Sequence, residues 1–146
     1  MKVRSDFVTN SSSSSFVIAF KEATIDEDTL AKYPFLKIIS EMPQLIFNAT
    51  GGYETEEAAI FNSKEEVDKH IIDKYGFGDY NTIEKILEAE KGSSMPDEYS
   101  ACIEYLNKGY SCAIKRISYS DGSLVDIMRK FADGNDNFII VEEEEC

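Results

Sequence analysis

The segment Ser118-Tyr-Ser-Asp-Gly-Ser123 brings hydroxyl groups, a carboxylate and a flexible backbone together. It follows a predicted strand and precedes a predicted helix, which is where open α/β sheets bind ligands. Hydroxyl and N–H groups at the start of a helix can hold an anion there. The same residue types are also ordinary turn and helix-cap residues, which is their commoner use. We therefore consider both a structural turn and a candidate ligand-binding turn formed by Ser118, Ser120, Asp121 and Ser123.

Histidine and cysteine are too few and too scattered to indicate a metal site or a catalytic nucleophile. His70 is the only histidine, so a zinc site could not contain two. Cys102, Cys112 and Cys146 are odd in number and show no C-x-x-C spacing, which also argues against a disulfide framework. We expect no catalytic residue, no metal, no cofactor and a reducing cytoplasmic location, and we favour a protein that is not an enzyme while leaving that question open.

Acidic residues dominate the charge. The chain has 28 Asp and Glu against 15 Lys and Arg, a net charge of -13, and residues 51–100 hold 13 acids against 5 bases. Such a surface repels phosphate backbones and anionic lipids, so we expect neither direct nucleic-acid binding nor membrane association. It favours a basic partner protein, although acidic surfaces also serve solubility alone. The candidate acidic interaction face is formed by Glu65, Asp68 and Glu88.

Apolar periodicity and turn residues divide the first 62 residues into short elements. Phe16–Phe20 is continuously apolar and predicts a buried strand. Thr24 and Glu27 have capping-box spacing and predict the start of a short helix, which Pro34 ends. A second short apolar turn ends at Pro43. The two apolar runs that flank the Gly51-Gly52 pair, residues 44–47 and 58–61, predict a hairpin.

The remaining residues predict three helices and then a strand, helix, strand unit. Ser63, Thr82 and Pro96 mark the helix starts, and Gly109 marks the end of the third helix. The last unit comprises a strand over residues 110–119, a helix over residues 123–132 and a strand over residues 138–141. About 18 residues separate the two strands, enough for a parallel crossover, and both strands are expected inside a sheet covered by helices.

The first 16 residues read Met-Lys-Val-Arg-Ser-Asp-Phe-Val-Thr-Asn, five serines and Phe16. This stretch resembles an N-terminal motif of small uncharacterised proteins from bacteriophages and Gram-positive bacteria, in which Phe-Val-Thr/Ser-Asn precedes a serine run and an apolar strand. The resemblance implies a phage or prophage-linked setting and transfers no catalytic or binding residue. The serine run is either a linker or local structural element, or a site of modification or recognition.

These observations predict an α/β fold, with α+β as the alternative: one globular domain over residues 16–146, preceded by an extended arm over residues 1–15. We expect a mixed β-sheet with a C-terminal β-α-β unit and several helices. The expected function is binding to a basic host protein, and one concrete form is an anti-defence inhibitor whose acidic helix faces mimic nucleic-acid phosphates. The alternative is a small-ligand-binding protein or enzyme that uses the turn around Asp121.

Overall fold

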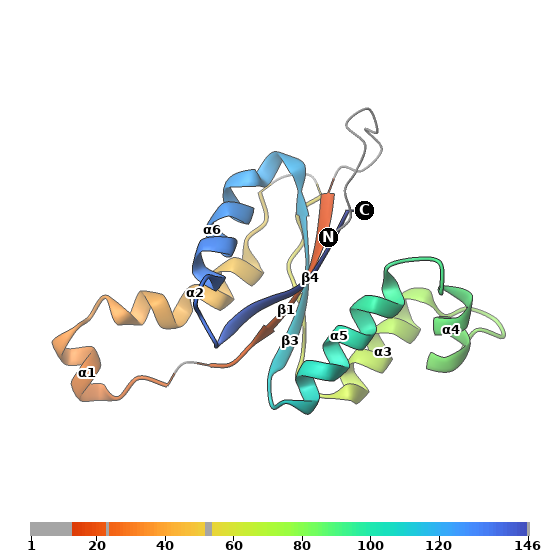
Figure 1. The fold of residues 1–146 in the computed structure, drawn as a ribbon, viewed down its shortest axis with the longest axis horizontal. Coiled ribbons are helices and arrows are strands. Elements are labelled where there is room, and N and C mark those ends of the chain that lie inside the picture. The colour runs from red at the N-terminus through yellow and green to blue at the C-terminus, as the bar shows by residue number, and fades with distance from the viewer. Residues whose placement is uncertain (1–12, 23, 52–53, 146) are drawn as a thin grey trace.

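The sheet is the centre of the molecule in the computed structural model, which describes residues 13–22, 24–51 and 54–145 (Figure 1). Its strand order is β2-β3-β1-β4. Every pair of neighbouring strands is antiparallel. The prediction of a single α/β domain is confirmed. The sheet was expected to be mixed, but each strand pairs antiparallel with its neighbours. The strands are β1 (Ser13–Phe20), β2 (Ala59–Phe61), β3 (Ser111–Ser118) and β4 (Phe138–Glu145).

The predicted β-α-β unit is present as β3, α6 (Gly122–Ala132) and β4. Because β1 pairs antiparallel with both β3 and β4, these two strands run parallel to each other with β1 between them. The prediction that both lie inside the sheet is correct for β3 and wrong for β4, which forms an edge. The strand β1 lies between β3 and β4, and its residues Phe16 to Ala19 are fully buried or nearly so. It therefore takes the inner position, and β4 is left at the edge.

Helices cover both faces of the sheet (Figure 1). On one face lie α3 (Lys64–Tyr75), α4 (Ile83–Ala89) and α5 (Met95–Asn107), and their core cluster includes Val17. On the other face lie α6 and the end of α2 (Leu36–Asn48), and their cluster includes Phe16 and Ile18. Successive strand residues point to opposite faces, so one strand contributes to both cores.

Three helix ends lie where the sequence predicts them. The hydroxyl of Ser63 accepts a hydrogen bond from the backbone N–H of Glu66, and the hydroxyl of Thr82 accepts one from that of Lys85, both at 3.3 Å. Gly109 follows α5 with φ of 91°, a conformation that glycine adopts without strain. These three boundaries confirm the sequence prediction.

The region between residues 24 and 61 differs from the prediction. The helix α1 (Glu27–Lys32) is capped by Asp26, whose Oδ1 lies 2.8 Å from the N–H of Thr29, and not by Thr24. The predicted hairpin is wrong, since residues 44–47 are the last turn of α2 and Pro43 lies inside that helix. Burial of Phe47 against Phe20 and Phe138, with ring centroids 4.8 and 5.9 Å away, favours continuation of the helix despite the proline.

The predicted boundary between the N-terminal arm and the domain also shifts. The strand β1 begins at Ser13, so the serines at positions 13 to 15 pair with β3 inside the sheet. Residues 1–12 of the predicted arm lie outside the described residues.

Among the helices of the described part of the chain, none is both long and apolar enough to cross a bilayer.

Candidate functional site

The predicted ligand turn forms a hydrogen-bond network with a distant segment of the chain. The carboxylate of Asp121 accepts a hydrogen bond from the Thr55 hydroxyl, which itself accepts one from the backbone N–H of Ser118 at 2.9 Å. Thr55 is only 6% exposed. A Cβ atom placed on Gly51 would lie 2.9 Å from Asp121 Oδ1, so the absence of a side chain there permits the close approach. Asp121 thus lies against Gly51 and, with Thr55, is connected to the end of β3.

The other residues of the turn have different environments. The Ser118 hydroxyl accepts from the N–H of Ser120 at 3.3 Å, and Ser123 lies exposed in the first turn of α6. A cleft of about 340 Å³ between β1 and α6 is lined by Ser118, and its lining does not include Ser120, Asp121 or Ser123. The structure therefore brings Ser118, Ser120 and Asp121 together as a structural turn at the margin of this cleft.

The three acids of the predicted interaction face lie on two helices and are interleaved with lysines. Asp68 on α3 lies 2.6 Å from Lys64 Nζ and also accepts a hydrogen bond from the Tyr99 hydroxyl at 2.7 Å. Burial and the Asp68 carboxylate raise the pKa of Tyr99. Glu88 on α4 lies 3.5 Å from the ammonium of Lys91. Glu65 is exposed in the first turn of α3.

Lys115 is a fully buried cation that the sequence prediction did not identify. It lies on β3 with 0% exposure. Its Nζ lies 3.2 Å from the carbonyl oxygen of Phe47, 2.6 Å from that of Ala49 and 2.5 Å from that of Glu56. Burial lowers the pKa of the Lys115 ammonium, while nearby acids raise it. Two of these carbonyls end α2, where a cation is favoured by the helix dipole.

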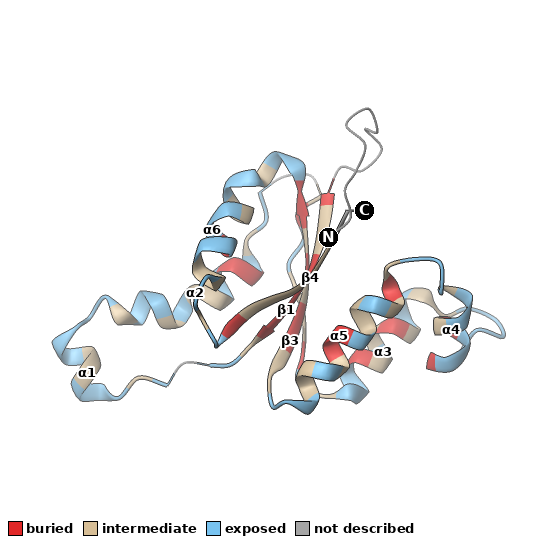
Figure 2. Ribbon diagram, viewed as in Figure 1, coloured by how far each residue is buried: buried red, intermediate tan, exposed pale blue. Residues whose placement is uncertain are grey.

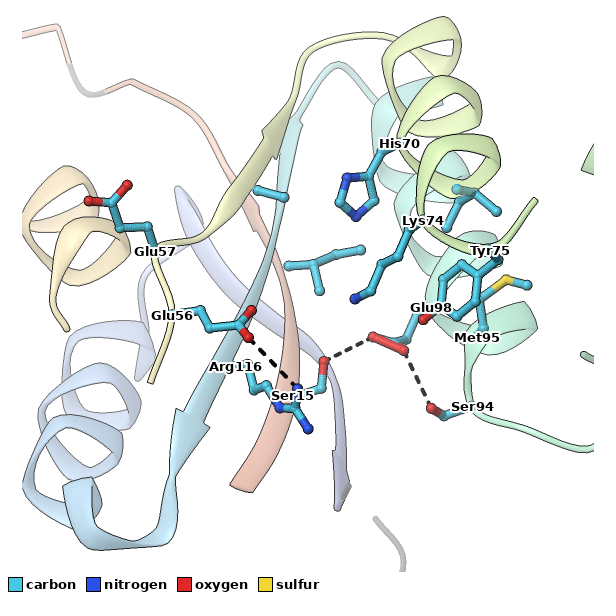
Figure 3. A pocket seen from close by; sticks show the side chains of 13 residues that line it. Ser15, Glu56, Glu57, His70, Lys74, Tyr75, Ser94, Met95, Glu98 and Arg116 are labelled. Atoms are coloured by element: carbon cyan, nitrogen blue, oxygen red, sulfur yellow. Dashed lines mark hydrogen bonds and ion pairs between the residues drawn. The ribbon is translucent and has the colours of Figure 1, made fainter. Parts of the chain in front are cut away.

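A second unpredicted feature is a cleft of about 290 Å³ between α3, the start of α5 and the sheet (Figure 3). Its apolar lining comes from Ala59, Ile71, Met95 and Ile114. Charged and polar side chains lie around this lining: His70 and Lys74 from α3, Glu98 from α5, Arg116 from β3, and Glu56 and Glu57 from the segment before β2.

Hydrogen bonds hold the polar side chains of this cleft in place. Glu98 accepts from the hydroxyl of Ser15 at 3.0 Å and from that of Ser94 at 3.4 Å. Nε of Arg116 donates to the buried Ser13 hydroxyl at 2.9 Å. The terminal nitrogens of Arg116 lie 3.8 Å from carboxylate oxygens of Glu54 and Glu56. Those two distances are ion-pair contacts and exceed hydrogen-bond length.

His70 lies at the upper end of the same cleft in Figure 3. Its ring packs against Phe61 with centroids 5.0 Å apart. Partial burial and the nearby Lys74 ammonium lower the pKa of His70, whereas Asp73 raises it. The imidazole is therefore neutral near pH 7 and can both donate and accept a hydrogen bond.

Large apolar side chains are exposed on α2 and on the segment that joins it to α1, and both helices project away from the sheet (Figures 1 and 2). We call residues 27–48 the α1–α2 projection. The helix α1 has no buried residue, and α2 buries only Ile46 and Phe47 in its last turn. The exposed fractions are 42% for Tyr33, 60% for Phe35, 60% for Ile38, 47% for Ile39 and 55% for Leu45.

The cysteines of the described residues are buried and not joined by a disulfide. The Cys112 thiol lies 3.4 Å from the carbonyl oxygen of Cys102, and hydrogen bonding of the Cys102 thiol to the Cys112 sulfur together with burial raises the pKa of Cys102. Cys146 lies outside the described residues. Within the described chain, no group of three His, Cys, Asp or Glu side chains is arranged to hold a metal ion.

The sequence does contain a signal for the two missed cations of β3. Lys115 and Arg116 are adjacent charges in the middle of an otherwise apolar strand, so one must face each side of a sheet that helices cover on both faces. The exposed projection has no such signal, because its apolar spacing matches that of a core helix.

Comparisons with protein-family models, with curated proteins and with solved structures find no match for this chain.

Proposed function

We propose that the protein acts by binding another protein, and that the α1–α2 projection is its docking element. The observation that carries this proposal is the group of five exposed large apolar side chains within residues 33–45. Proteins that act as monomers rarely expose a contiguous apolar patch of this kind unless it serves an interaction.

The spacing of the exposed residues supports one mode of binding. Ile38 and Leu45 are seven residues apart, about two helical turns, and so lie on one side of α2, with Phe35 three residues before Ile38 at the start of the helix. An amphipathic helix with anchors at this spacing docks into an apolar groove on its partner. The proposed occupant of the surface is therefore a partner protein that offers a groove for α2.

The area available is enough for the centre of an interface. Large side chains of this type bury about 150–250 Å² each, so five side chains that are half exposed offer on the order of 500 Å². A standard interface buries about 800 Å² on each partner. The rest of the contact must come from the rim of the projection, where residues 27–48 hold three acids and two lysines; the acid surplus that favours a basic partner lies in residues 51–100.

The setting of this interaction rests on the N-terminal resemblance. In a phage or prophage context the partner is a host protein in the cytoplasm, and the concrete form is inhibition of a defence protein. Mimicry of nucleic-acid phosphates by Glu65, Asp68 and Glu88 has weaker support, because Lys64 and Lys91 lie beside two of these three acids. Docking through the apolar projection needs no such mimicry.

The test compares partner binding by matched surface variants. A partner is first captured from the natural host with the wild-type chain, and its dissociation constant is then measured by calorimetry with purified proteins. The double variant Phe35→Ser with Ile38→Ser should bind at least about 100-fold more weakly, as expected when central apolar anchors are lost. Ile127→Ser is the control, because Ile127 is 48% exposed but lies on α6.

Two outcomes would overturn the proposal. One is a partner that binds the Phe35→Ser, Ile38→Ser variant as tightly as the wild type. The other is a wild-type protein that forms a dimer at micromolar concentration while the double variant is monomeric, because the projection would then serve self-association. Light scattering during size-exclusion chromatography distinguishes the second case.

A further inference from the structure

We propose that the cleft between α3, α5 and the sheet binds a small organic anion with an apolar body, such as an aromatic or branched aliphatic carboxylate. This inference is independent of protein docking, because the cleft and the α1–α2 projection involve different elements (Figures 1 and 3). The sequence-based candidate for a ligand site, the turn around Asp121, does not contribute to it.

The interior of the cleft is suited to an apolar group. Ile71, Met95 and Ile114 are partly or fully buried and line the cleft, together with Ala59. An apolar cavity of roughly 150 Å³ accommodates benzene. The cleft volume of about 290 Å³ therefore holds one ring and a short side chain.

The cations of the cleft face each other across this apolar lining. Lys74 extends from α3 into the opening, and Arg116 extends from β3 on the opposite side (Figure 3). No carboxylate of the described residues lies within ion-pair distance of the Lys74 ammonium. Its Nζ lies 5.5 Å from the centroid of the Tyr75 ring. The terminal nitrogens of Arg116 lie 3.8 Å from the carboxylate oxygens of Glu54 and Glu56, which is beyond hydrogen-bond length. Their N–H groups can therefore still donate to a ligand carboxylate.

Of the three acids that line the cleft, Glu56 and Glu98 already have partners, and Glu57 points away from it in Figure 3. Glu98 already accepts hydrogen bonds from two serine hydroxyls, and the Glu56 side chain is 61% exposed and paired with Arg116. An amine would have to compete with Lys74 and Arg116 for these carboxylates. The distant acids of the chain weaken anion binding only modestly, because charges beyond about 10 Å are screened at 0.1 M ionic strength.

His70 provides the remaining polar contact. Its ring is fixed against Phe61 and faces the cleft between the helices and the sheet (Figure 3). As a neutral imidazole it can donate one hydrogen bond to a carboxylate oxygen without adding a desolvated charge. The geometry thus places two cations and one neutral donor around an apolar surface, each of them a possible contact for a ligand carboxylate.

The experiment uses three probes of similar shape and different charge: phenylacetate, phenylacetamide and phenethylamine. Each is titrated to about 20 mM into the full-length protein while backbone amide shifts are recorded by NMR, since small ligands of this size bind with dissociation constants on the order of 1–10 mM. Phenylacetate should shift amides of α3, β3 and the start of α5. The amide and the amine should bind at least about fivefold more weakly.

Two lysine variants on α3 separate a specific contact from the general field. Lys74→Gln should weaken phenylacetate binding at least about fivefold and leave phenylacetamide binding unchanged. Lys69→Gln is the control, because Lys69 is 80% exposed on the same helix, pairs with Asp73 and does not line the cleft. The proposal is overturned by an absence of shifts at these amides, by equal binding of the amine, or by equal effects of the two variants.

Discussion

Replacement of Lys115 by methionine tests whether a buried cation attaches the α1–α2 projection to the sheet. Methionine preserves most of the side-chain volume and removes the donor to the carbonyls of Phe47, Ala49 and Glu56. All three carbonyls lose the lysine donor, but Phe47 O keeps a second partner, the N–H of Ala58 at 2.9 Å, so the loss falls mainly on the carbonyls of Ala49 and Glu56.

The expected loss follows from these two carbonyls. An unsatisfied buried acceptor costs about 1–3 kcal/mol. The loss is partly offset because the variant no longer desolvates an ammonium ion. We therefore expect Lys115→Met to lower the free energy of unfolding by about 2–4 kcal/mol, a large part of the 5–15 kcal/mol typical of a domain.

Urea unfolding followed by circular dichroism measures the change. With a slope of about 1–3 kcal/mol/M, the midpoint should fall by roughly 1–2 M. Lys69→Met is the matched control and should change the free energy of unfolding by less than about 0.5 kcal/mol, because Lys69 is exposed. A Lys115→Met midpoint equal to that of the control would show that the three contacts do not stabilise the fold.

Four further changes test other parts of the structure. Ser63→Ala removes the cap of α3 and should cost about 0.5–2 kcal/mol in thermal or urea unfolding; no loss would refute the cap. Thr55→Val leaves the N–H of Ser118 and the Asp121 carboxylate without their shared partner and should cost about 1–3 kcal/mol, which a midpoint equal to wild type would contradict. Phe35→Ser should change the unfolding free energy by less than about 0.5 kcal/mol, since Phe35 is 60% exposed, and a larger loss would mean that the projection packs within the monomer. The lowered pKa of His70 means that the imidazole binds a proton more tightly in the unfolded state than in the folded state. The free energy of unfolding of the wild type, relative to that of His70→Gln, should therefore fall as the pH drops below 6.5, the ordinary histidine value. A difference that does not change with pH would exclude this linkage.

The sequence predicts the parts of the fold that depend on local signals. Ser63 and Thr82 cap their helices as expected, because an N-cap needs only a side chain and the next turn of backbone. The strand, helix, strand order after residue 110 is also correct. The position of β4 at the edge was not predictable in the same way, because it depends on which strand takes the centre, and β1 lies more than 90 residues earlier in the chain.

The errors concentrate where distant packing overrides a local signal. Pro43 predicts a helix end, but Phe47 packs on rings from β1 and β4 and the helix continues to it. The candidate site shows the same limit. Lys115 finds its carbonyl partners about 60 residues away, and the charged residues of the cleft come from four separate segments, so spacing along the chain cannot reveal either arrangement.

The central position of β1 has a consequence for how the chain folds during synthesis. Its two partners, β3 and β4, are translated long after it, and Phe138 follows Phe20 by 118 residues. At about 5–20 residues per second, roughly 6–24 s pass before both edges of β1 can be paired. The apolar run from Phe16 to Phe20 has two open edges until β3 is synthesised and one until β4 follows, and an open edge is a template for pairing with another nascent chain. Rapid synthesis or chaperone binding at this run should therefore raise the yield of folded protein more than stabilising either layer of helices.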